Sequence, residues 1–93
     1  MSVQVGDALK LQATFTVSDV ATDPTTITLE VQDPSGNTDS YTYAGGGVTK
    51  TSTGIYYRIV TFDEAGTWIY QWTATGAVVT VEGDKIYVDE ALL

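Results

Sequence analysis

The fold is decided by one stretch of the chain, Phe62-Asp63-Glu64-Ala65-Gly66-Thr67-Trp68-Ile69-Tyr70-Gln71-Trp72-Thr73-Ala74-Thr75-Gly76. An acidic turn closed by Gly66 leads into a segment in which aromatic residues recur at every second position. Successive side chains of a β-strand point to opposite faces, so Trp68, Tyr70, Trp72 and Ala74 share one side of a sheet. Because aromatic side chains bury more area than others, we expect this face at the centre of the core.

The same aromatic row has a second interpretation as an exposed platform on which sugars or single-stranded nucleic acid bases stack. The two interpretations differ in burial. An exposed platform would favour glycan binding, whereas buried Trp68 and Trp72 with a paired, apolar edge would favour assembly with other proteins. The central, buried strand is the favoured interpretation.

Alternating apolar and polar residues on both sides of this stretch predict further half-buried strands. The expected core consists of Leu9, Leu11, Phe15, Ile27, Leu29, Val31, Trp68, Tyr70 and Trp72. In the long segment 8–18, Ala13 and Val17 fall on the same inward face. Strands are expected over 8–18, 26–32, 38–43, 48–52, 55–62, 67–75 and 78–88, the last interrupted at 82–84. About seven short strands, turn signals every ~8–12 residues and no helical periodicity are typical of an all-β sandwich.

The alternation is less clear in the segment 55–62. One face carries Arg58 beside Tyr56, Val60 and Phe62, and the other carries the apolar row Ile55, Tyr57 and Ile59. Either a β-bulge shifts the register here or both faces are covered, one of them by a partner.

Length and composition limit the classes of protein that the chain can represent. Its 93 residues are expected to form one domain, 1–93, with a short C-terminal tail, 89–93. Four Lys and Arg against twelve Asp and Glu give a net charge of −8, which disfavours nucleic acid and would complement a basic patch on a protein partner. The absence of Cys excludes a disulfide. We find no signal peptide and no apolar run long enough for a membrane span, so synthesis in a cytoplasm is expected.

Two loops resemble a calcium site and a phosphate-binding loop, but each lacks residues that such a site requires. Asp33, Ser35, Asn37 and Asp39 alternate like calcium ligands, but Gly36 is misplaced for an EF-hand loop and the bidentate Glu is missing. We expect an ordinary turn, no metal and no cofactor. The segment 45–51 lacks the Gly directly before the Lys that a phosphate-binding loop needs.

Catalysis is not expected. Without His or Cys, only carboxylate chemistry remains, and adjacent Asp63 and Glu64 diverge on an extended backbone. Glu82 and Asp84 could share a face at ~7 Å spacing, although a polar bulge or turn explains them equally well. The sequence therefore offers no candidate catalytic residue.

Three segments resemble the small stand-alone immunoglobulin-like proteins encoded among the structural genes of tailed bacteriophages and prophages. They are Pro24-Thr25-Thr26-Ile27-Thr28-Leu29-Glu30-Val31-Gln32-Asp33-Pro34-Ser35-Gly36, Ser52-Thr53-Gly54-Ile55-Tyr56 and Ala65-Gly66-Thr67-Trp68-Ile69-Tyr70-Gln71-Trp72. The resemblance implies an immunoglobulin-like β-sandwich of about seven antiparallel strands. The pair of Cys residues that links the sheets of antibody domains is missing, and the two tryptophans could supply that packing.

The resemblance also implies a function. It indicates a non-enzymatic virion protein, a capsid decoration or accessory protein that binds the major capsid protein and is compatible with a homo-oligomer on the particle. A neck or tail accessory protein and a glycan-binding adhesion module are the alternatives.

Attachment to such a particle is expected to use apolar contact, backbone pairing or negative charge, since the chain has few cations. The candidate binding residues are Ile55, Tyr57, Ile59, Val3, Val5, Leu92 and Leu93. The first three would form an exposed apolar row, and the others lie in extended terminal segments that could add a strand to a partner's sheet. The alternative, that Ile55 and Ile59 are the buried face and Leu92 and Leu93 a frayed tail, stays open here.

Overall fold

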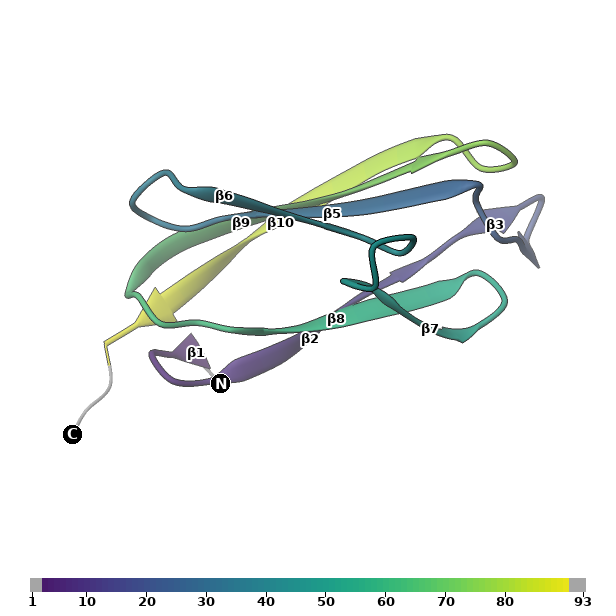
Figure 1. Cartoon of the computed structure of the whole chain (residues 1–93). Coiled ribbons are helices and arrows are strands. Elements are labelled where there is room, and N and C mark those ends of the chain that lie inside the picture. Colours follow the sequence, from purple (N-terminus) through teal and green to yellow (C-terminus); the bar gives the residue numbers. More distant parts are fainter. Residues whose placement is uncertain (1–2, 91–93) are drawn as a thin grey trace.

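Two β-sheets lie face to face in the computed structural model, which describes residues 3–90 (Figure 1). The larger sheet has the order β1-β10-β9-β5-β6, formed by Val3–Gln4, Thr80–Asp89, Gly66–Thr75, Thr26–Gln32 and Thr38–Thr42. The smaller sheet has the order β2-β8-β7, formed by Ala8–Thr14, Ile55–Thr61 and Thr49–Ser52. A small hairpin of β3 (Thr16–Val17) and β4 (Val20–Ala21) lies at one end. Neighbouring strands are antiparallel except β1 and β10, and seven strands have four or more residues, so the predicted β-sandwich is confirmed.

Strand β9 is central to the larger sheet, as its aromatic row predicts. It pairs with β10 on one side and with β5 on the other, which sets Trp72 opposite Leu29. Trp68 and Trp72 are only 7% and 3% exposed, because their face of the sheet packs toward the smaller sheet. The expected buried row is therefore confirmed, and neither tryptophan offers a platform for a ligand.

The core contains all nine residues of the expected set, with Leu9 and Tyr70 only partly buried, whereas Val17, also predicted to face inward, lies outside it. Further core positions come from segments whose pattern is irregular: Val48, Tyr56, Val60, Phe62, Val78 and Val88. Phe62 is fully buried, and its ring meets Trp68 of the opposite sheet edge-to-face at a centroid distance of 5.0 Å. Contacts of this kind lock the two sheets together.

The acidic turn before β9 is built around Gly66. This residue has a φ of 132°, and a Cβ added there would lie 2.8 Å from the Cβ of Pro34. The indole N–H of Trp68 donates to the backbone carbonyl of Glu64 at 2.9 Å, while the Ser35 hydroxyl donates to the Glu64 carboxylate at 2.6 Å. The turn between β5 and β6 and the turn before β9 are thereby held against each other.

The predicted strand 8–18 is wrong in its second half. Strand β2 ends at Thr14, and the chain then turns into the β3–β4 hairpin. Ser18 and Asp19 both have positive φ, of 49° and 65°, as a two-residue type I′ hairpin turn requires. The hairpin leaves Val17 44% exposed instead of inward, since it pairs only with β4 beyond the end of the smaller sheet.

Two further expectations need correction. Strand β10 is not interrupted at 82–84, because Glu82, Gly83 and Asp84 all stay in register with β9. A side chain at position 83 would meet the Tyr70 carbonyl oxygen at 2.6 Å, so glycine fits this regular strand. Asp89, the first residue of the predicted tail, is the last residue of β10.

The irregularity expected within 55–62 lies on the neighbouring strand. The pairing of β7 with β8 shifts between Lys50 and Ser52, whereas β8 pairs with β2 without a shift from Ile55 to Thr61. Strand β8 therefore alternates regularly, with Arg58 on the inward side.

Within residues 3–90, no helix is long and apolar enough to cross a membrane.

Candidate functional site

The predicted apolar row lies on the outer face of the smaller sheet. Tyr56 and Val60 of β8 are buried, so Ile55, Tyr57 and Ile59 point to the opposite, outer side. Ile59 is 59% exposed, while Ile55 and Tyr57 are half-buried. The alternative in which Ile55 and Ile59 form the buried face is therefore wrong.

The strands next to β8 contribute neutral or cationic residues to this outer face. Register places Lys10, Gln12 and Thr14 of β2 opposite Ile59, Tyr57 and Ile55, respectively. The Lys10 ammonium lies 4.4 Å from the centroid of the Tyr57 ring, in the range of a cation–π contact. The positive charge of Lys10 is thus partly stabilised by Tyr57, a member of the apolar row itself.

The whole smaller sheet is free of carboxylates. Its three strands contain Lys10, Lys50 and Arg58, three of the four cations of the chain, and none of its twelve acidic residues. The acidic residues lie in the larger sheet, in the connecting segments and, for Glu90, directly after β10. We call the exposed side of β2, β8 and β7 the acid-free face. It could have been found from the sequence by counting charges strand by strand.

The predicted terminal residues lie elsewhere in the fold. Val3 and Val5 are half-buried and pack against the core. Strand β1 pairs with Val88 and Asp89, and the Val5 N–H donates to the Asp89 carbonyl at 2.9 Å, so this segment is already part of the larger sheet. Leu92 and Leu93 lie outside the described residues, and their proposed role stays a prediction.

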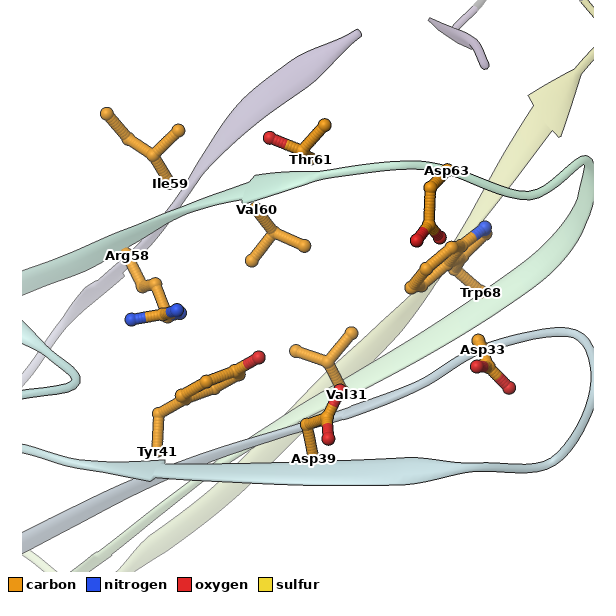
Figure 2. Close-up of a pocket in the computed structure, with 10 residues that line it drawn as sticks. All are labelled: Val31, Asp33, Asp39, Tyr41, Arg58, Ile59, Val60, Thr61, Asp63 and Trp68. Carbon is orange, nitrogen blue, oxygen red and sulfur yellow. The ribbon is translucent and has the colours of Figure 1, made fainter. Parts of the chain in front are cut away.

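A pocket of about 350 Å³ opens between β6 and β8 on one flank of the sandwich (Figure 2). It exists because β7 pairs with β8 only as far as Tyr57, which leaves the segment 58–61 without a neighbour on that side among residues 3–90. The pocket is lined by Val31, Asp33, Asp39, Tyr41, Arg58, Ile59, Val60, Thr61, Asp63 and Trp68.

Arg58 connects the two sheets at this flank. Figure 2 shows its guanidinium group reaching from β8 toward the ring of Tyr41 on β6, and the distance to the ring centroid is 3.6 Å. One guanidinium nitrogen donates to the Gly47 carbonyl at 2.8 Å. The cation therefore ties β8 to β6 and to the connection that follows it. It fills, on the inward side, a position that an apolar residue would otherwise occupy.

The carboxylates in the pocket wall do not form a metal cage. The Asp33 carboxylate is already hydrogen-bonded within its own turn, since it accepts the Asn37 backbone N–H at 2.9 Å. Within residues 3–90, no group of three or more acidic side chains is close enough to hold a metal ion. The turn interpretation of 33–37 is supported by the hydrogen bond from the Gly36 N–H to the Asp33 carbonyl at 3.0 Å.

A second polar cluster, around Asp23, was not anticipated. Its carboxylate accepts from the Lys50 ammonium at 2.7 Å, the Gly54 N–H at 2.8 Å and the Tyr56 hydroxyl at 2.9 Å. The hydrogen bonds from Lys50 and Gly54 lower the pKa of Asp23 to about 2. Burial, followed by the bond to Asp23, raises the pKa of Tyr56 to about 12. The cluster fastens the segment before β5 to the β7–β8 hairpin, which is a structural role.

No protein-family model matches the chain, and neither a curated protein nor a solved structure does.

Proposed function

We propose that the chain is a non-enzymatic structural protein of a tailed bacteriophage particle. It acts as a capsid decoration or accessory protein that binds other virion proteins, foremost the major capsid protein, through the acid-free face. The observation that carries the proposal is the outward-facing apolar row of half-buried Ile55 and Tyr57 and exposed Ile59, on a sheet whose strands contain no carboxylate. The sequence resemblance is the reason for proposing a phage particle, and the acid-free face is the surface by which the protein would attach to it.

Strand order supports an immunoglobulin-like assignment. In immunoglobulin domains, strands B, E and D share one sheet, and G, F and C share the other, extended by C′ in the variable type. The order β2-β8-β7 corresponds to B-E-D, and β10-β9-β5-β6 corresponds to G-F-C-C′. The antibody disulfide would join β2 and β9. In this chain β9 carries Trp68 and Trp72 in the core instead.

Electrostatics favour this face over the rest of the surface for protein contact. Covering the row Ile55, Tyr57 and Ile59 would remove apolar area from water, a gain of about 25 cal/mol per Å². Covering carboxylates would instead cost desolvation free energy unless each found a partner. On the acid-free face the exposed charge is Lys10, already set against Tyr57. The acidic larger sheet would then stay in water.

The alternatives differ in testable ways. A glycan-binding module would use exposed, stacked aromatics, and the burial of both tryptophans speaks against that use of β9. A neck or tail accessory protein would use the same face, but it would occur in far fewer copies per particle. Copy number relative to the major capsid protein in purified particles therefore separates the two virion locations.

The attachment test uses Ile59→Glu and a matched control, Ile69→Glu. Both isoleucines are exposed on outer strand faces, at 59% and 42%, but Ile69 belongs to the larger sheet. Each variant is added to particles that lack the protein, and bound protein is quantified after sedimentation. We expect Ile59→Glu and Tyr57→Glu to lose occupancy and Ile69→Glu to retain it. Folded Ile59→Glu and Tyr57→Glu variants that load like wild type would refute the acid-free face as the attachment surface.

A further deletion addresses the C-terminus. Removing residues 90–93 tests the separate expectation that Leu92 and Leu93 take part. If the deleted protein and both β8 variants load normally, neither predicted attachment region is correct. Absence of the protein from purified particles would refute the virion assignment itself.

A further inference from the structure

The opposite flank of the sandwich, between β10 and β2, has two uncovered strand edges. Strand β10 pairs with β9 from Thr80 to Val88, but on its other side it pairs with β1 only at Val88 and Asp89. Strand β2 pairs with β8 and has no second neighbour among residues 3–90. Uncovered edges present backbone N–H and C=O groups that can pair with another chain.

A hollow of about 330 Å³ lies between these two edges. It is lined by Gln12, Ala13 and Thr14 of β2, Tyr70 and Trp72 of β9, and Glu82, Gly83 and Asp84 of β10. Register sets Glu82 opposite Trp72 and Asp84 opposite Tyr70, so both carboxylates are on the inward side of β10. They are exposed at the mouth of the hollow, whereas charged residues on a sandwich strand are expected on the outward side.

Polar groups in this hollow have few partners of their own. Trp72 is 3% exposed, and its indole Nε1 is buried without a hydrogen-bond partner. The Asp84 carboxylate accepts only the adjacent Lys85 backbone N–H, at 2.8 Å, and the Glu82 carboxylate has no hydrogen-bond partner in the described part of the chain. Within residues 3–90, the one ion pair joins Lys50 to Asp23. Burial raises the pKa of Tyr70, and the charge of nearby Asp84 adds to the rise.

We propose that this flank binds an extended segment of a partner protein that carries Lys or Arg at alternate positions. The segment adds to the free edge of β10 between Thr80 and Ile86. Two of its basic side chains pair with Glu82 and Asp84. Residues two apart on a strand are separated by ~7 Å, so the spacing of the two carboxylates matches that of alternate side chains on an added strand.

Charge disfavours a second copy of this chain as the occupant in the register that centres on the hollow. Antiparallel pairing of two β10 edges about Gly83 would set Glu82 of one copy directly opposite Asp84 of the other. Like charges directly opposite each other destabilise a strand pair, and each copy carries a net charge of −8. A basic segment turns the same two carboxylates into attractive contacts. The inference rests on the proposed role as a protein-binding module, but it concerns a different surface.

The test uses the full chain and two synthetic peptides, without particles. One peptide alternates Lys with Val and Thr over ten residues, and the other has Glu in place of each Lys. Amide chemical shifts of the labelled protein are followed up to millimolar peptide. We expect the Lys peptide to shift amides of 80–87 and 8–14, to bind more weakly as salt increases, and the Glu peptide to have no effect.

Charge-neutralising variants locate the contact. The pair Glu82→Gln and Asp84→Asn should weaken binding of the Lys peptide by about fivefold, as for two exposed ion pairs. The control pair Glu30→Gln and Asp39→Asn removes the same charge from β5 and β6 and should leave affinity within about twofold. Peptide binding should also be unchanged in Ile59→Glu.

Several results would overturn the inference. These are the absence of shifts at millimolar peptide, equal binding of the Glu peptide, shifts confined to the edges of β6 and β8, or unchanged affinity in the β10 variant. Self-association through β10 in sedimentation would also overturn it. Absence of binding would mean that the inward carboxylates only protect the edge from pairing. None of these outcomes bears on particle loading through the acid-free face, so the two proposals fail independently.

Discussion

The two sheets bury similar apolar faces against each other and differ in what they expose. The smaller sheet contains three cations and no carboxylate, whereas the strands of the larger sheet contain five carboxylates and one cation. Of the remaining seven acidic residues, six lie in connecting segments and Glu90 follows β10. The net charge of −8 is therefore unevenly distributed, since the smaller sheet is positively charged and the larger sheet is negatively charged. The smaller sheet is suited to apolar contact, whereas the acidic larger sheet is suited to water or to basic partners.

The largest expected effect tests what the sheets share. Phe62 is fully buried and joins the smaller sheet to Trp68 of the larger one. Phe62→Ala should lower the free energy of unfolding by about 3–5 kcal/mol, a large share of the stability of a small domain. Denaturant titration followed by tryptophan fluorescence measures the change, and Val79→Ala, at a position 80% exposed, is the control. A loss under about 1 kcal/mol would contradict the shared core.

The next effect concerns the turn that starts the central strand of the larger sheet. Gly66→Ala adds a methyl group 2.8 Å from the Pro34 Cβ and imposes an unfavourable φ, so we expect a loss of about 1–3 kcal/mol. Gly6→Ala is a useful comparison, since Gly6 also has positive φ but no atom within 4 Å of an added Cβ. Thermal unfolding should rank Gly66→Ala as the more damaging; the reverse order would mean that Pro34 moves freely.

A third prediction uses pH to test the link between the smaller sheet and the segment before β5. The pKa of Asp23 falls to about 2 in the folded state, below its ordinary 3.8. Its stabilising contribution is therefore complete above the unfolded value and is lost as the pH falls from about 4 to 2. Wild type should lose more stability over that window than Asp23→Asn does. Parallel curves for the two proteins would show that the carboxylate contributes nothing.

The same hydrogen bond predicts a change at alkaline pH. The pKa of Tyr56 is raised to about 12, first by burial and then by Asp23. A raised folded-state pKa means that stability is complete below about 10 and is lost as the pH rises toward 12. Tyr56→Phe should remove this loss, which urea titrations between pH 9 and 12 can measure. If the variant follows the wild-type curve, ionisation of other tyrosines controls the alkaline transition.

The smallest expected effect separates the two roles of β8. Ile59 is on the exposed face, so Ile59→Glu should change the free energy of unfolding by no more than about 0.5 kcal/mol. Thermal melts of Ile59→Glu and Ile69→Glu should both lie close to wild type. A large loss in Ile59→Glu alone would mean that its side chain supports the fold, and particle loading could then not be interpreted from that variant.

Regular alternation made part of the fold predictable. In 26–32 and 67–75, strict period-two patterns placed Ile27, Leu29, Trp68 and Trp72 in the core, because a strand buries every second residue. Prediction failed where turn geometry overrides alternation. Val17 continues the pattern of β2, but the positive φ values of Ser18 and Asp19 turn it into an exposed hairpin. Neither residue is a glycine, so the sequence carried little signal for that turn.

The candidate surfaces were predictable to different degrees. The row Ile55, Tyr57 and Ile59 was identified from spacing, but its exposure depended on which side of β8 faces the other sheet. The cluster around Asp23 could not be identified, since its hydrogen bonds to Lys50 and Tyr56 cross about 30 residues of chain. The pairing of Arg58 with Tyr41 was equally hidden, because the two residues belong to different sheets.

The sequence by itself determined the strand periods, the central position of the tryptophan strand and the unbalanced charge, because these depend on residue type and on spacing along the chain. Only the tertiary structure decided which strands lie at edges, where β7 stops beside β8, and that Glu82 and Asp84 point inward on an uncovered strand. Those properties depend on contacts between residues far apart in sequence. Such contacts form only when strands distant in sequence pair and the two sheets pack, so spacing along the chain does not reveal them.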